Sequence, residues 1–357
     1  MRIPLIALVA LGAAPAARQA PPASPAAPCT TATTACEQWV IYGAGPARSM
    51  VYATYALRTP NAAITRALIM VHGAARNADH YFRTATAAAF LDGALGNTIV
   101  VAPHFIAERD TAQPNEVRWP ERGDTWRSGG MSPSNPTLSS FDFMDEILRT
   151  LADKNVFPNL ATIVVAGHSA GGQFATRYEM ANKVDGTLGV RIRYVVANPS
   201  SYAWPAAVRP LPTGDASPDA ALGEPLGKLG ETVHTTYAYG PFDSTRVPRY
   251  NHWPAGLEDR HGYTAQMSDE QLRKQLAERT TTYLLGQVDV LPLGGFDSSP
   301  SAMAQGPTRR ARGEAFFKYV TETLGAKTAT AIIVPECGHN DRCIYTTREV
   351  FPVIFPK

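Results

Sequence analysis

The clearest candidate for chemistry in the sequence is a serine between two glycines. Residues 167–171 are Gly-His-Ser-Ala-Gly, with an apolar β-branched segment before them and a helical pattern after them. Where a strand turns sharply into a helix, a side chain at either flank would collide with neighbouring backbone, so glycine is favoured. The turn exposes the hydroxyl beside a helix N-terminus, which favours negative charge. The pattern predicts that Ser169 is a nucleophile; the alternative is a glycine-rich turn with a capping serine.

A nucleophilic serine needs a base and an acid that orients the base. His339 follows a predicted strand over residues 329–334 and comes directly after a glycine, so we predict that it is the base. For the acid, Asp289 lies just beyond a predicted strand over residues 281–285, and Asp297 is its rival eight residues later in a glycine-rich loop. We favour Asp289, because a short distance from a strand end fixes the position of a side chain better.

The same chemistry needs backbone donors for the oxyanion. Residues 71–74 are Val-His-Gly-Ala and end an early predicted strand. The N–H of Ala74 and the N–H of Ala170, directly after the serine, are therefore the predicted oxyanion hole. For His72 and Gly73, the alternative is an ordinary turn from a strand into a loop.

Alternating strands and helices must hold these residues in place. Predicted strands cover residues 66–71, 97–102, 161–166, 191–197, 281–285 and 329–334, with an antiparallel edge hairpin over 38–41 and 51–57. Predicted helices follow Ser139 or Ser140, follow Ser268, and cover 172–181 and 309–323. Continuous β-branched strands are typical of a parallel sheet buried on both faces. We therefore predict an α/β fold with a mostly parallel central sheet and helices on both faces.

Taken in chain order, these features resemble the α/β-hydrolase superfamily. His72–Phe82 is similar to the His-Gly…Ala-Asp-x-Phe segment of secreted feruloyl esterases and polyhydroxybutyrate depolymerases, and Ser169–Gly172 also matches those enzymes. The resemblance covers about residues 38–357. It implies an α/β-hydrolase fold and a serine esterase whose triad is Ser169, Asp289 and His339.

A longer stretch of residues, 203–267, is rich in proline, glycine and aromatic residues. We expect it to be a loop-rich insertion over the active site, since ligands bind at the carboxyl edge of such sheets. Aromatic residues in or near the site loops are candidates for substrate binding: Trp126, Tyr202, Trp204 and Trp253. The alternative is that they form the cores of long loops.

The N-terminal residues are predicted to be a signal for export. Residues 1–16 combine a basic start, a short apolar run and Ala-Pro-Ala, as in a signal peptide. The run is well below the roughly 20 residues that span a bilayer, so no stable membrane anchor is expected after cleavage. We predict a Pro- and Ala-rich leader over residues 17–37, a single domain over 38–357, and a secreted or periplasmic location.

Four cysteines fall into two close pairs. Cys29 and Cys36 lie seven positions apart, and Cys337 and Cys343 lie six apart. In an oxidising compartment they predict two local disulfides, although the sequence alone allows three pairings. The competing possibility is a zinc site, but neither pair has the two-to-four-residue spacer typical of structural zinc.

Composition narrows the class of protein. The 357 residues include 33 basic and 31 acidic side chains, a balance that argues against a nucleic-acid partner. The sequence thus predicts a secreted serine hydrolase that cleaves small or polymeric carboxylic esters through an acyl-enzyme, with no metal and no cofactor. An amidase or peptidase on the same triad is the alternative chemistry, and a non-catalytic extracellular binding protein is a weaker one.

Overall fold

The structure is a computed structural model that describes residues 27–123, 125–212, 237–242 and 244–357. The predicted signal peptide and residues 17–26 of the predicted leader lie outside this part of the chain. The end of the predicted leader, in contrast, belongs to the fold. Cys29 and Cys36 form a disulfide, the Cys29 N–H donates to the Thr54 carbonyl oxygen, and Cys36 is buried. The ordered domain therefore begins before residue 38.

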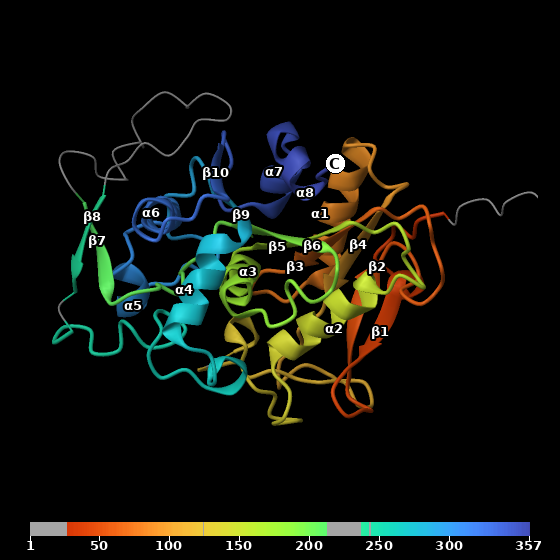
Figure 1. Ribbon diagram of the computed structural model, residues 1–357, viewed down its shortest axis with the longest axis horizontal. Helices are drawn as coiled ribbons and strands as arrows, with labels where there is room; N and C mark the ends of the chain where they lie inside the picture. The colour runs from red at the N-terminus through yellow and green to blue at the C-terminus, as the bar shows by residue number, and fades with distance from the viewer. Residues whose placement is uncertain (1–26, 124, 213–236, 243) are drawn as a thin grey trace, which may run out of the picture.

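An eight-stranded sheet forms the centre of the molecule, in the order β1-β2-β4-β3-β5-β6-β9-β10 (Figure 1). Its strands are β1 (Glu37–Ile41), β2 (Arg48–Ala53), β3 (Arg66–Val71), β4 (Thr98–Pro103), β5 (Thr162–His168), β6 (Arg191–Ala197), β9 (Thr280–Gly286) and β10 (Ala329–Val334). Strands β3, β4, β5, β6, β9 and β10 pair in parallel, and β2 pairs antiparallel with both of its neighbours, β1 and β4. The predicted parallel sheet and edge hairpin are confirmed, with the second hairpin strand earlier than expected.

Alternation along the central strands supplies two hydrophobic cores. In β3, Leu68 and Met70 pack on one face of the sheet, whereas Ile69 and Val71 pack on the other. Successive side chains of a strand point to opposite faces, so a run of apolar residues buries both. This explains why continuous apolar segments, without polar alternation, form the centre of this sheet.

Helices cover both faces, as Figure 1 shows. On one face lie α1 (Ala78–Leu91), α7 (Asp341–Tyr345) and α8 (Phe351–Ile354); the other carries α2 (Ser140–Ala152), α3 (Ala170–Ala181), α4 (Asp269–Glu278) and α6 (Arg309–Lys318). Ser139 and Asp142 form a capping box that starts α2, and the Ser268 side chain caps α4. Within the described residues, no helix combines the length and apolar character needed to cross a membrane.

Shorter elements complete the described chain. They are α5 (Pro300–Met303), single 3-10 turns over Thr34–Cys36, Trp126–Ser128, Gly262–Thr264 and Arg348–Val350, and a π-helical turn over Tyr319–Thr323. The helix predicted for residues 309–323 is therefore α-helical only to Lys318.

The predicted insertion is divided between two places. Strands β7 (Val208–Pro212) and β8 (Tyr237–Pro241) form a separate hairpin at the edge of the molecule, and the Tyr239 hydroxyl donates to the Ala315 carbonyl oxygen of α6 (Figure 1). Among the described residues of the insertion, those around 249–255 border a pocket near the carboxyl edge of the sheet.

Candidate active site

The carboxyl ends of the parallel strands lie side by side at one edge of the sheet. Val71 of β3 pairs with Gly167 of β5, and Gly286 of β9 pairs with Val334 of β10. Each residue predicted for the site follows one of these strand ends within a few positions. The register therefore collects residues from distant parts of the sequence at one edge.

Ser169 forms a strained turn between β5 and α3. Its φ is 59° and its ψ is −118°, a conformation that costs a non-glycine residue about 1–3 kcal/mol. Two glycines make the turn possible: a Cβ on Gly167 would lie 2.1 Å from the Gly171 carbonyl oxygen, and one on Gly171 would lie 2.2 Å from that of Val71. The turn places Ser169 directly before the N-terminus of α3.

His339 connects Ser169 to Asp289 through both of its ring nitrogens. Its Nε2 lies 2.9 Å from the Ser169 Oγ, and its Nδ1 lies 2.8 Å from the Asp289 Oδ2. An ionised carboxylate only accepts hydrogen bonds, so we assign the proton to Nδ1. The lone pair of Nε2 then faces the serine hydroxyl, which is the geometry needed to remove its proton.

Asp289 is buried together with a cation that the sequence did not single out. The Arg309 Nη1 lies 3.3 Å from the Asp289 Oδ1, and the Arg309 Nε donates to the Ser200 Oγ at 2.7 Å. Burial lowers the pKa of Arg309, and the negative charge of Asp289 opposes this. Before the fold is known, an arginine at the start of a helix looks like any solvated one. Only the tertiary structure identifies this one as the counter-ion of the buried carboxylate.

Asp297 lies elsewhere. Its Oδ2 accepts from the Ser201 hydroxyl at 3.3 Å, and its Oδ1 accepts from the Ser299 N–H at 3.0 Å. Of the two candidate acids, the structure brings Asp289 to His339.

A buried histidine fixes the turn that follows β3. The Phe105 N–H donates to the His72 Nε2 at 3.0 Å, so the other ring nitrogen carries the proton and donates to the Gly73 carbonyl oxygen at 2.9 Å. Burial lowers the pKa of His72 to about 3, which keeps the ring neutral. A Cβ built on Gly73 would lie 3.7 Å from the Ser169 Cβ, so this turn packs against the serine. Within the described chain, neither Ala74 nor Ala170 donates its N–H to another protein group.

A second buried histidine, His168, packs against His339 with 4.6 Å between the ring centroids. Its Nδ1 lies 3.0 Å from the Tyr81 hydroxyl. Burial holds the pKa of His168 well below its usual range, and charge on His339 lowers it further. His168 therefore offers His339 a neutral packing surface, a role that the serine motif alone did not indicate.

Three contacts hold the loop that carries His339. The Cys337–Cys343 disulfide closes it, so both predicted disulfides are present in the structure. The Asn198 side chain donates to the Gly338 carbonyl oxygen at 3.2 Å, and the Thr84 hydroxyl of α1 donates to Asp341 at 2.7 Å. The loop is thus fixed both to the end of β6 and to α1.

Two pockets lie near this edge of the sheet, although Ser169, Asp289 and His339 line neither of them. The first, of about 350 Å³, is bordered by Gln173, whose N–H donates to the Ser169 carbonyl oxygen, and by Trp253. The second, of about 340 Å³, is bordered by Ala74 and Trp126. Trp126 and Trp253, two of the four aromatic residues predicted to bind substrate, therefore border these pockets, although most of each side chain is buried in the core.

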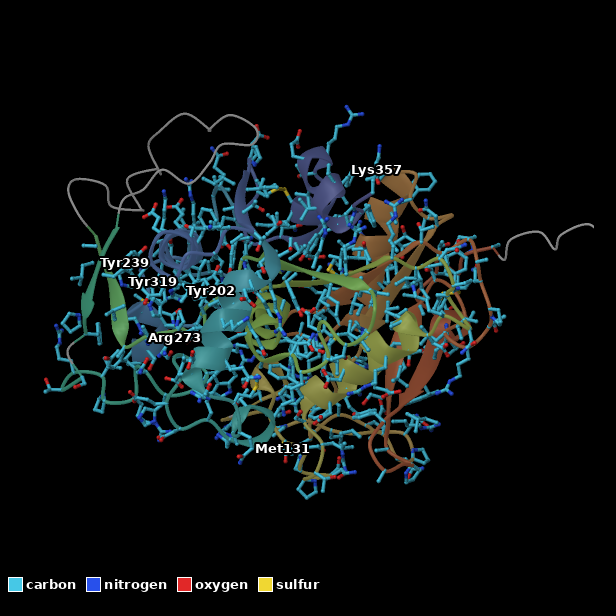
Figure 2. The ribbon with its side chains drawn as sticks, viewed as in Figure 1. Met131, Tyr202, Tyr239, Arg273, Tyr319 and Lys357 are labelled. Atoms are coloured by element: carbon cyan, nitrogen blue, oxygen red, sulfur yellow. A yellow bond between two sulfur atoms is a disulfide. The ribbon has the colours of Figure 1, made fainter. Side chains whose placement is uncertain are left out.

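The other two aromatic residues belong to the core. Tyr202 and Trp204 have 0% exposed surface; Tyr202 stacks on Phe316 at 4.3 Å, and Trp204 packs beside Phe316 and Tyr319. Figure 2 shows Tyr202 on the side of the molecule where Tyr239 and Tyr319 lie. This placement contradicts a direct contact with substrate. Tyr202 and Trp204 come shortly after the end of β6, in a segment that packs directly against Phe316 of α6.

Comparison with known proteins places the chain in a class. The model of the alpha/beta hydrolase family matches residues 68–351, and the chain belongs to this family. No curated protein has a significant sequence match.

Two solved structures have similar folds. The chain is similar to poly(aspartic acid) hydrolase-1 from Sphingomonas sp. KT-1, with a TM-score of 0.58, 22% identity, and coverage of 88% of this chain and 97% of that one. It is also similar to LpqC, a poly(3-hydroxybutyrate) depolymerase from Bordetella parapertussis, with a TM-score of 0.56, 18% identity, and coverage of 85% and 83%.

Proposed function

We propose that this protein is a serine hydrolase that cleaves carboxylic esters through an acyl-enzyme intermediate. The observation that carries the proposal is the continuous hydrogen-bonded path from Ser169 through His339 to Asp289. Membership of the alpha/beta hydrolase family and the strained turn at Ser169 support it.

In the first half of the reaction, His339 Nε2 removes the Ser169 proton as Oγ attacks the ester carbonyl carbon. The imidazolium that forms is stabilised by Asp289, whose carboxylate holds the Nδ1 proton. When the tetrahedral intermediate collapses, the bond to the alcohol oxygen breaks and His339 returns its proton to that oxygen. The acyl group remains on Ser169.

In the second half, His339 removes a proton from water, which attacks the acyl carbonyl carbon, and Ser169 leaves with the proton. In both halves the N–H groups of Ala74 and Ala170 stabilise the oxyanion. Removing one such donor typically costs about 3–4 kcal/mol of transition-state stabilisation.

We further propose that the protein acts outside the cytoplasm, secreted or in a periplasm. The two disulfides support this location, because disulfides persist in oxidising compartments.

A fluorophosphonate probe is expected to label Ser169 and no other serine, because only Ser169 has a histidine nitrogen 2.9 Å from its hydroxyl among the described residues. Peptide mass spectrometry identifies the labelled residue. Turnover of 4-nitrophenyl esters of graded chain length, methyl ferulate, polyester films and aryl amides then defines the chemistry. Labelling of another serine would contradict the proposal, and faster turnover of amides than of esters would identify an amidase instead.

Removing the Cys337–Cys343 disulfide with paired Cys→Ser changes is expected to lower kcat by up to about 10²-fold, because the bridge closes the loop that carries His339. The loss of stability should be about 2.4 kcal/mol for a loop of this size. We suggest measuring kcat at a temperature where circular dichroism shows both proteins folded.

The matched control removes the Cys29–Cys36 disulfide, which closes a loop of similar length far from His339 along the chain. This variant should lose similar stability and keep its kcat. Equal kcat values for the two double variants would show that the Cys337–Cys343 bridge serves stability alone.

A further inference from the structure

Arginines are concentrated around the two pockets bordered by Gln173 and by Ala74, near the carboxyl edge of the sheet. Arg76, Arg109, Arg122 and Arg127 border one pocket, and Arg127, Arg177 and Arg249 border the other. Among the described residues that border them, these six arginines face two carboxylates, Glu121 and Asp297, which leaves an excess of four positive charges in the described part of the walls. The whole chain has an excess of only two. The described residues around these pockets are therefore richer in positive charge than the chain as a whole.

Some of these cations are already neutralised. Arg76 pairs with Asp110 through two hydrogen bonds of 2.9 and 3.0 Å. Arg109 pairs with Glu121 at 2.9 Å, and both of these side chains are partly exposed to solvent. Pairs of this kind contribute little attraction for a further anion.

Arg127 differs from them. Its Nε donates to the Thr125 hydroxyl at 3.1 Å and its Nη1 donates to the Gln173 side-chain oxygen at 3.3 Å. Both partners are neutral, and no described carboxylate lies within ion-pair distance of it. Burial lowers the pKa of Arg127, and the more distant negative charge of Asp297 opposes this shift. A guanidinium has five N–H donors in a planar fork, so donors remain for another ligand.

Arg127 contacts α3, the helix that begins directly after Ser169. It is the charged side chain that borders both pockets. Its partner Gln173 lies one helical turn after Ser169, and the Gln173 N–H donates to the Ser169 carbonyl oxygen. On the other side, Ala74 of the proposed oxyanion hole borders the same pocket as Arg127.

We propose that Arg127 binds a carboxylate of the substrate, so that the preferred substrates are esters that carry a negative charge close to the scissile bond. The proposal rests on the proposed ester hydrolysis for turnover, whereas the anion site itself stands on geometry. A planar guanidinium binds a carboxylate through two parallel hydrogen bonds, and such charge-assisted bonds are about twice as strong as neutral ones.

The kinetic test compares two substrates of one shape. The 4-nitrophenyl monoester of adipic acid carries a terminal carboxylate, and the 4-nitrophenyl ester of adipamic acid replaces it with a neutral amide. We expect kcat/KM to favour the carboxylate by about 10- to 100-fold in the wild-type protein. Arg127→Gln should reduce this ratio to near one, and Arg127→Lys should restore part of it. A ratio near one in the wild-type protein, or a ratio unchanged by Arg127→Gln, would overturn the proposal.

Arg58→Gln is the matched control. Arg58 is exposed in the loop between β2 and β3, and β3 begins at the edge of the sheet opposite to Ser169. The Arg58→Gln change removes the same charge as Arg127→Gln and should leave the ratio of the two kcat/KM values unchanged. An equal loss of preference in this variant would show that net charge, and not a site at Arg127, attracts the anion.

Binding measured without turnover separates this inference from the proposed function. Isothermal titration of the Ser169→Ala protein with adipate should show binding. The double variant Ser169→Ala, Arg127→Gln should not bind adipate. Adipate binding together with a wild-type protein that hydrolyses no ester would support the anion site and refute the proposed function. Ester hydrolysis without adipate binding would refute the anion site and leave the proposed function standing.

Discussion

Replacing Ser169 with alanine is expected to lower kcat for ester hydrolysis by about 10⁶-fold and to leave the fold intact. The large loss follows from removal of the nucleophilic oxygen, which lies 2.9 Å from His339 Nε2. The fold should persist because alanine also carries a Cβ, so the backbone strain at φ 59° changes little. Initial rates on 4-nitrophenyl butyrate measure the loss, and near- and far-ultraviolet circular dichroism checks the fold.

Ser268→Ala is a control that should change stability and not activity. The Ser268 side chain caps α4, so its loss should lower stability by about 1 kcal/mol and leave kcat unchanged. An active Ser169→Ala protein with unchanged circular dichroism would refute the proposed mechanism, whatever the behaviour of Ser268→Ala.

Asp289→Asn is expected to lower kcat by about 10⁴-fold. The asparagine side chain can donate a hydrogen bond to His339 Nδ1 and thereby hold the ring in the wrong tautomer, with a proton on the nitrogen that faces Ser169. The same change removes the charge that faces Arg309, whose side chain is fully buried. A fall in melting temperature should therefore accompany the loss of activity, because an unpaired buried charge is strongly destabilising.

Asp297→Asn is the matched comparison, since it makes the same chemical change 3.3 Å from the Ser201 hydroxyl and not at His339. We expect kcat to change little. A larger loss of kcat in Asp297→Asn than in Asp289→Asn would transfer the orienting role to Asp297 and contradict the assignment made from geometry.

Asp289, the acid favoured by its spacing, lies beside His339 for a physical reason. Asp289 comes three residues after the end of β9, and a chain so short cannot carry a side chain far from the strand end. Asp297 follows a longer loop, so its position depended on contacts that no local pattern reveals. The positions of the four aromatic residues likewise depended on tertiary contacts. Trp126 and Trp253 line pockets, whereas Tyr202 and Trp204 are covered by α6 and the β7–β8 hairpin.

The sequence by itself determined the order of the strands along the chain, the sharp turn at Ser169 and the strand ends that carry Asp289 and His339. Local sterics and the spacing of apolar residues encode these features, and both act over a few neighbouring residues. The tertiary structure decided which charges meet. Arg309 opposite Asp289, His168 beneath His339, and Arg127 between two pockets each depend on packing between elements far apart in the sequence. Burial and electrostatic pairing are properties of the assembled fold, and no local pattern of residue types specifies them.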